Sequence, residues 1–258
     1  MSRNRLVNVV NLGRMGFMNA NCIQTRFARQ HLDYIKGVQG VNGENVLLLV
    51  EHNPVYTTGI RSKDYSEEDE RKLKNLGAEF YRTNRGGLIT FHGHGQLVAY
   101  PVLNLHNFTP SMRSYINSLE KTMIETCRHF GLKAHTTEET GVWIEDSKIG
   151  AIGVHGTRFV TTHGVSLNCN IDLDWYKDII PCGIEGKEVT SLTKEKGYTI
   201  HIHDAVVPFL ESFQQEFDCQ LEFTMMEGHE IDFLVNAMSE FKSNQSNQKV
   251  KANQKHMW

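Results

Sequence analysis

The stretch Arg85–Leu105, RGGLITFHGHGQLVAYPVLNL, contains two apolar segments, with two glycines before the first and two glycines and two histidines between them. The segments Leu88–Phe91 and Leu97–Val102 are rich in apolar and aromatic residues, so each is predicted to form a strand. Glycines this dense beside strands permit sharp turns and a close approach of another group to the backbone. A ligand is the usual group, so this stretch predicts a binding site built on strands.

The rest of the chain alternates between strand and helix patterns. The apolar run Val46–Val50 predicts a buried strand, and Ser66 and Ser111 each begin a predicted helix. The second of these helices would bury Tyr115, Leu119, Met123 and Cys127. Residues 142–170 are predicted to form a three-stranded meander with turns at Asp146-Ser147 and Gly156-Thr157. The fold class is therefore α/β (α+β), a mixed sheet flanked by helices.

The C-terminal part continues this pattern and then loses it. Asp204 begins a predicted helix, Cys219–Phe223 a predicted edge strand and Ile231–Phe241 a predicted last helix. The inward face of the helix from Asp204 would carry Val207, Leu210, Phe213 and Phe217. From Ser243 the chain is rich in Asn, Gln, Lys and Ser. We therefore expect one domain over residues 1–241 and a disordered polar tail over 242–258.

Composition limits the class of protein. The chain has 258 residues, 40% of them apolar and 22% charged, as in ordinary soluble globular proteins. A net charge of −3 argues against nucleic acid as the main partner. No apolar run approaches the roughly 20 residues of a membrane span, so no membrane association is expected. Five scattered cysteines without a C-x-x-C pair indicate a reducing compartment.

Residues 1–32 allow two interpretations, an organelle import sequence or ordinary folded structure. Its basic residues precede the first acid, Asp33, and are Arg3, Arg5, Arg14, Arg26 and Arg29. Such arginine-rich, acid-poor stretches are typical of organelle import sequences. The same residues also predict a strand over Leu6–Leu12 and a helix over Asn19–Ile35, so ordinary folded structure accounts for them equally well.

Cys182 and Lys148 stand in glycine-rich surroundings, PCGIEG and KIGAIG. A cysteine thiolate is a strong nucleophile, and the small Gly183 leaves room for a substrate carbonyl and supplies an N–H for an oxyanion. The alternative is that Cys182 is a small buried apolar residue. Lys148 would share one strand face with Gly150, Ile152 and Val154. There it would lower the pKa of a thiol or act as a base, or else be a solvated lysine beside a turn.

Histidines provide a weaker signal. His92 and His94 would share a strand face, and His155, His163 and Cys169 offer further ligands, but no spacing matches a zinc pattern. We expect no metal site, and interpret these residues as the wall of a polar pocket. Arg85 is either an anion anchor or an exposed arginine.

Four blocks of the sequence together resemble a known family. RGGLITFHGHGQLVAYPVLNL, TGVWIEDSKIGAIGV, THGVSLNCNIDLDWY and IIPCGIEGKEVTSL look like the signature blocks of lipoyl(octanoyl) transferases, in the same order. The resemblance runs from about Val7 to about Phe223 and is closer to animal than to bacterial members. His94 is a departure, because the family usually has proline there.

The resemblance implies a fold and an activity. The fold is that of the biotin/lipoate protein ligase catalytic domain. The activity moves an octanoyl group from acyl carrier protein to a lysine of lipoyl domains, in the E2 subunits of 2-oxoacid dehydrogenases and the glycine cleavage H protein. It requires no cofactor, and the resemblance further implies a monomer in the mitochondrial matrix, with the cytoplasm as the alternative.

The resemblance also assigns roles to residues. Cys182 would form the acyl thioester and Lys148 would lower its pKa and transfer protons. The residues that would bind the acyl chain are Arg85, Gly86, Gly87, Leu88, Ile89, Thr90, Phe91, His92, Ala151, Ile152, Gly153, Gly164, Val165 and Ser166. Two alternatives remain: an ATP-dependent lipoate or biotin ligase or lipoyl amidotransferase of the same fold, and a non-catalytic binder of acyl carrier or lipoyl domains.

Overall fold

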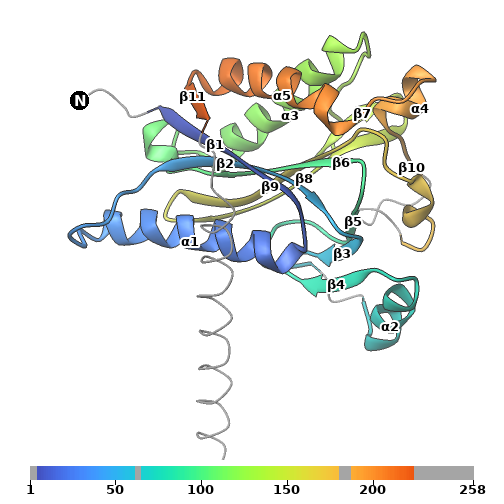
Figure 1. Cartoon of the computed structure of the whole chain (residues 1–258), viewed down its shortest axis with the longest axis horizontal. Helices are drawn as coiled ribbons and strands as arrows, with labels where there is room; N and C mark the ends of the chain where they lie inside the picture. Colours follow the sequence, from blue (N-terminus) through green and yellow to red (C-terminus); the bar gives the residue numbers. More distant parts are fainter. Residues whose placement is uncertain (1–4, 62–64, 180–186, 224–258) are drawn as a thin grey trace, which may run out of the picture.

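The computed structural model describes residues 5–61, 65–179 and 187–223, which form two β-sheets with helices on both sides (Figure 1). The larger sheet has eight strands in the order β10-β8-β9-β6-β2-β1-β11, with β7 paired to β8. Its strands are β1 (Leu6–Met15), β2 (Asn45–His52), β6 (Gln96–Val102), β7 (Val142–Ile144), β8 (Ser147–Thr157), β9 (Val160–Asn168), β10 (Glu188–Val189) and β11 (Gln220–Phe223). β1 runs parallel to β2 and β11, whereas β2, β6, β9 and β8 pair antiparallel, so the predicted mixed sheet is confirmed.

A smaller sheet has the order β4 (Glu79–Arg82), β3 (Val55–Thr58) and β5 (Thr90–His92). Strands are present on both sides of the HGHG turn, but the first covers Thr90–His92 and begins two residues later than predicted. β5 pairs with β3, and β6 pairs with β2 and β9. The turn therefore carries the chain from one sheet to the other.

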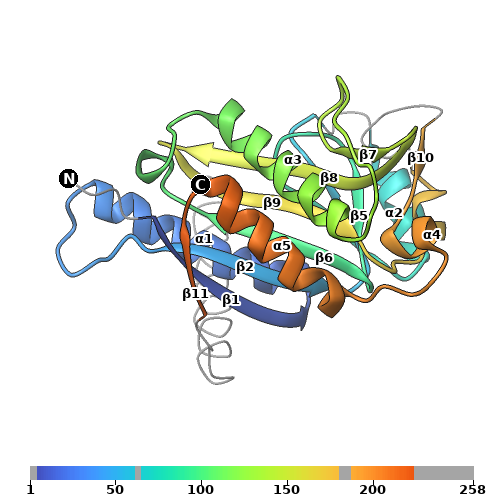
Figure 2. The same ribbon diagram turned by 90° about the horizontal axis from the view of Figure 1, so that it is seen from above.

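Helices cover both faces of the larger sheet. α1 (Phe17–Ile35) lies on one face, and α3 (Met112–His129) and α5 (Ile202–Phe217) lie together on the other (Figures 1 and 2). The main apolar core fills the space between the sheet and the α3–α5 pair. α2 (Glu67–Asn75) begins at Ser66 as predicted, where Ser66 and Asp69 form a reciprocal capping box. The remaining short helices are α4 (Leu192–Lys196), η2 (Leu105–Asn107) and η3 (Leu173–Tyr176).

The predicted buried face is confirmed for α3 and confirmed in part for α5. Tyr115, Leu119, Met123 and Cys127 are all buried. On α5, Leu210, Phe213 and Phe217 are buried, but Val207 is 59% exposed and Phe209 is fully buried instead. Val207 precedes Phe209 by two residues, which is about 200° around a helix, so the two side chains point to opposite faces.

The predicted meander over residues 142–170 is confirmed as β7, β8 and β9, but both of its turns are displaced. Glu145 has φ 49° between β7 and β8, and Arg158 and Phe159 have φ 51° and 62° between β8 and β9. Consecutive positive φ angles match the right-handed twist of a hairpin. Because neither Arg158 nor Phe159 is a usual turn residue, the sequence pattern placed this turn at Gly156-Thr157.

Two predicted C-terminal features lie outside the residues that the structure describes. They are the helix Ile231–Phe241 and the polar tail 242–258. In the described part of the chain, no helix has both the length and the apolar character needed to cross a bilayer.

Candidate active site

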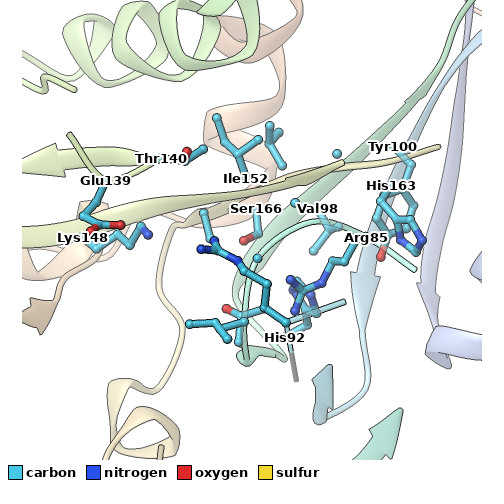
Figure 3. A pocket seen from close by; sticks show the side chains of 18 of the residues that line it. Arg85, His92, Val98, Tyr100, Glu139, Thr140, Lys148, Ile152, His163 and Ser166 are labelled. Carbon is cyan, nitrogen blue, oxygen red and sulfur yellow. The ribbon is translucent and has the colours of Figure 1, made fainter. Parts of the chain in front are cut away.

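A pocket lies where the segment 85–92 passes over strands β6, β8 and β9 of the larger sheet (Figure 3). The predicted site residues that line it are Arg85, Gly87, Leu88, Thr90, His92, Lys148, Ala151, Ile152, Gly153, Gly164, Val165 and Ser166. Lys148 and Glu139 lie at one end, and His163 and Tyr100 at the other (Figure 3). We call this cavity the central pocket.

Three predicted residues near the pocket do not line it. Ile89 and Phe91 are fully buried in the apolar cluster beneath the smaller sheet, where the Phe91 ring stacks on Trp175 at 4.8 Å. The Gly86 N–H donates to the Val154 carbonyl at 2.9 Å and so joins the segment to β8. Cys182 lies outside the described residues.

Lys148 is a buried lysine. Its side chain is 6% exposed, and Nζ lies 5.0 Å from the centre of the Trp143 ring, within the range of a cation–π contact. Gly141, with φ 131°, lies against it, because a Cβ there would be 2.4 Å from Lys148 Cε. Of the two readings of Lys148, the structure therefore excludes a solvated lysine.

A β-bulge decides which face of β8 carries Lys148. β7 pairs Val142 with Gly150 and Trp143 with Lys148, so Ile149 is an extra residue on β8. Ile149 packs in the α3–α5 core, and a Cβ on Gly150 would meet Met123 of α3. Lys148 thus shares the pocket face with Ala151 and Gly153, and the predicted grouping with Gly150, Ile152 and Val154 is wrong. An extra residue of this kind reverses the alternation of side chains.

Arg85 is buried, so the interpretation as an exposed arginine is wrong. It is 7% exposed, and its guanidinium donates to the Thr57 carbonyl at 2.6 Å, to Thr57 Oγ1 at 3.0 Å and to the Gly86 carbonyl at 3.0 Å. A Cβ on Gly153 would lie only 2.8 Å from the Cδ of Arg85, so the Arg85 side chain packs directly against Gly153. Arg85 therefore spans from the smaller sheet to β8 and places a buried positive charge beside the pocket.

Histidines around Arg85 are neutral. Burial lowers the pKa of His92 and of His163 to about 3, and the Arg85 charge contributes to both shifts. Burial also lowers the pKa of His52 to about 4, and this ring hydrogen bonds to the Tyr100 hydroxyl at 2.8 Å. His92 Nδ1 lies 2.7 Å from Gln96 Oε1. No group of three metal-ligating side chains occurs within the described ranges.

A chain of buried hydrogen bonds through side-chain and backbone amides links all four sequence blocks. Asn168 Oδ1 accepts from Gln96 Nε2 at 2.8 Å, and Asn168 Nδ2 donates to the Thr190 carbonyl at 2.9 Å. The Thr190 N–H donates to the Lys148 carbonyl at 2.9 Å. These bonds fix the strand that follows the Cys182 segment against Lys148. Sequence reasoning assigned no role to Asn168, Gly141 or Tyr100, although all three lie within the blocks that carry the resemblance.

The other four cysteines are poor nucleophiles. Cys22, Cys127, Cys169 and Cys219 are buried, and none of them lines the central pocket. Burial raises the pKa of Cys127, Cys169 and Cys219 to about 12, so these thiols stay protonated near neutral pH.

Comparison with known proteins defines the class. Residues 30–214 match the model of the lipoyl protein ligase A/B catalytic domain, so the chain belongs to that family. An archaeal putative lipoate protein ligase from T. acidophilum with bound lipoic acid has the same fold, with a TM-score of 0.65 at 14% identity over 90% of this chain and 94% of that one. The predicted ligase-type fold is confirmed.

Closer relatives narrow this class to octanoyltransferases. The chain is 50% identical over 217 residues to the mitochondrial octanoyl-[acyl-carrier-protein]:protein N-octanoyltransferase LIPT2 of Danio rerio, covering 84% of this chain and 95% of the relative. It is 40% identical to the Homo sapiens protein of the same name, over 85% of this chain and 96% of the relative. The predicted resemblance to the octanoyltransferase family, including its animal mitochondrial members, is confirmed.

Proposed function

We propose that this chain transfers an octanoyl group from octanoyl-acyl carrier protein to a lysine of lipoyl domains, through a thioester on Cys182. One observation carries the proposal: a buried lysine ends a narrow pocket lined mostly by residues of three of the four sequence blocks shared with octanoyltransferases. Ala151, Gly153 and Gly164 supply small side chains or none along this pocket, as a linear acyl chain requires. Burial of the acyl chain is driven by the hydrophobic effect.

Cys182 is the nucleophile in this proposal. The described cysteines are buried away from the pocket, which leaves Cys182 as the available thiol. The chain on both sides of its segment also supports the assignment. Ile179 packs in the cluster that holds Ile89 and Phe91, and Val189 pairs with Lys148 on β8.

The proposed reaction has two acyl transfers. The Cys182 thiolate attacks the carbonyl of the carrier thioester, and the carrier thiol leaves with a proton supplied by Lys148. The amine of the target lysine then attacks the Cys182 thioester, its proton passes to Lys148, and the Cys182 thiolate is released. The product is an amide, which is more stable than a thioester, and no nucleotide is consumed. Positively charged Lys148 beside the thiol favours the thiolate.

Partners and location follow from the same proposal. The acceptors are the lipoyl domains of E2 subunits and the glycine cleavage H protein. The relatives named above are mitochondrial, which supports the mitochondrial matrix over the cytoplasm. The predicted monomer and the single domain over 1–241 remain predictions.

Intact-protein mass spectrometry tests the proposal directly. The full chain is mixed with octanoyl-acyl carrier protein without ATP. We expect an octanoyl adduct that maps to Cys182 and disappears when a lipoyl domain is added, and Cys182→Ala or Cys182→Ser should abolish both adduct and transfer. An adduct that needs ATP would favour a ligase, and no adduct under either condition would favour a non-catalytic binder.

A further inference from the structure

Two cavities of this protein share the lining residues His163 and Phe17. The central pocket is one of them. The other is an open groove of about 940 Å³ between α1 and the segment Tyr81–Asn84. Because His163 lines both cavities, its side chain forms part of the wall between them.

His163 is held rigidly in this wall. It lies in β9 with φ 58°, a conformation that costs a residue with a side chain about 1–3 kcal/mol in general. Its N–H donates to Gln24 Oε1 of α1 at 2.6 Å, and its Nε2 lies 2.8 Å from Asn84 Oδ1. The ring packs edge-on against Tyr100 with centroids 6.3 Å apart, and the residue is 3% exposed. A strained residue fixed at this many points has a defined position.

The distance from Lys148 to His163 matches an eight-carbon chain. His163 pairs with Val154, which follows Lys148 by six residues, one of them taken up by the bulge. Five strand rises correspond to roughly 16 Å. Seven carbon–carbon bonds of about 1.5 Å in a zigzag span roughly 9 Å, and non-bonded contact distances of about 3.5 Å at each end of the chain account for the remainder. An octanoyl chain whose carbonyl lies at Lys148 thus ends beside the His163 ring.

The groove behind His163 has apolar residues among its polar and charged lining. Ala28 and Leu32 of α1 and Val160 of β9 line it. An acyl chain that passed the position of His163 would therefore find apolar surface to cover, in place of open solvent.

We propose that His163, fixed by Asn84 and Gln24, closes the far end of the central pocket and limits the enzyme to acyl chains of about eight carbons. This inference rests on the proposed function. Closure is steric: the ring fills the passage between pocket and groove, so a twelve-carbon chain meets it before its thioester reaches Lys148.

His163→Gly is the decisive variant, because glycine adopts φ 58° without strain and keeps the N–H that binds Gln24. His155→Ala is the matched control, since His155 lines the groove but not the central pocket. Octanoyl-, dodecanoyl- and hexadecanoyl-acyl carrier proteins are each incubated with the full chain, and acyl-enzyme formation is followed by intact mass. The quantity compared is the ratio of kcat/KM for twelve carbons to that for eight.

We expect this ratio to rise at least about tenfold in His163→Gly, the scale by which a pocket discriminates between chains of unequal length. It should stay unchanged in His155→Ala. Asn84→Ala, which keeps the ring but removes its anchor, should raise the ratio less, and this variant decides the question if His163→Gly does not fold. A ratio that does not rise while the wild type forms its octanoyl adduct overturns the inference alone. A wild type that forms no adduct overturns the proposed function as well.

Discussion

Replacing Gly141 by alanine tests whether the position of Lys148 matters more than its presence. The added Cβ would lie 2.4 Å from Lys148 Cε, 3.1 Å from Lys148 Nζ and 2.8 Å from the Gly150 carbonyl oxygen. The Gly150 oxygen belongs to the bulged strand and cannot retreat without disturbing β8. Lys148 is therefore the group that moves, by an ångström or so, and its amine leaves the end of the pocket.

The cost to stability has two parts. A side chain at φ 131° adds about 1–3 kcal/mol of backbone strain, and overpacking adds a similar amount. Together they lower the free energy of unfolding by about 2–6 kcal/mol, which for a chain of this size lowers Tm by roughly 4–24 °C.

The effect on acyl transfer should be larger than the loss of stability explains. A catalytic group displaced by about 1 Å typically costs a factor of about 100, so kcat/KM for octanoyl transfer should fall by about that factor. The control is Gly131→Ala at the end of α3, where φ is 70° and the nearest atom to a Cβ is Lys196 Nζ at 3.7 Å. It should lose stability and keep its activity. If folded Gly141→Ala transfers octanoyl groups at the wild-type rate, the packing argument for Lys148 is wrong.

Two further outcomes can be checked with standard assays. Lys148→Arg should lose most transfer activity although it keeps the positive charge, because a guanidinium does not act as a base. Full activity of this variant would mean that Lys148 contributes only its positive charge. The free energy of unfolding, measured by urea titration, should fall as pH is lowered from 6.5 towards 4. Burial lowers the pKa values of His52, His92 and His163 to about 3–4 in the folded state. In this pH window these three side chains therefore bind protons in the unfolded chain but stay neutral in the folded protein, which favours unfolding. His163→Asn should make this dependence shallower, and a slope equal to that of the wild type would contradict the lowered pKa of His163.

The periodicity of apolar residues predicted the helices and strands of this fold well, but it did not predict which sheet each strand joins. The inward face of α3 and the meander of β7, β8 and β9 follow from apolar spacing and turn residues alone. The HGHG turn looks locally like a hairpin, and nothing in its sequence indicates that β5 and β6 join different sheets. That arrangement depends on pairing with β3, which lies some 35 residues earlier in the chain.

The candidate site shows the same division. Most of the described residues that glycine density and the family blocks singled out line the pocket, whereas Gly86, Ile89 and Phe91 do not. The face on which Lys148 lies was wrong, because strand alternation assumes a regular ladder and Ile149 interrupts it. The burial of Arg85 was also missed, since its partners are backbone carbonyls whose positions depend on the tertiary fold.

Arg85 sets the spacing between the two sheets on either side of the pocket. Its guanidinium is bound to Thr57 in the smaller sheet, and its aliphatic stem rests against Gly153 in the larger one. The central pocket is in effect a seam between two sheet layers, and this side chain is the spacer within the seam. Substitutions along the seam can therefore retune which acyl group fits while both layers keep their own hydrogen-bonded ladders. An architecture of this kind allows substrate range to diverge among related enzymes without a new fold.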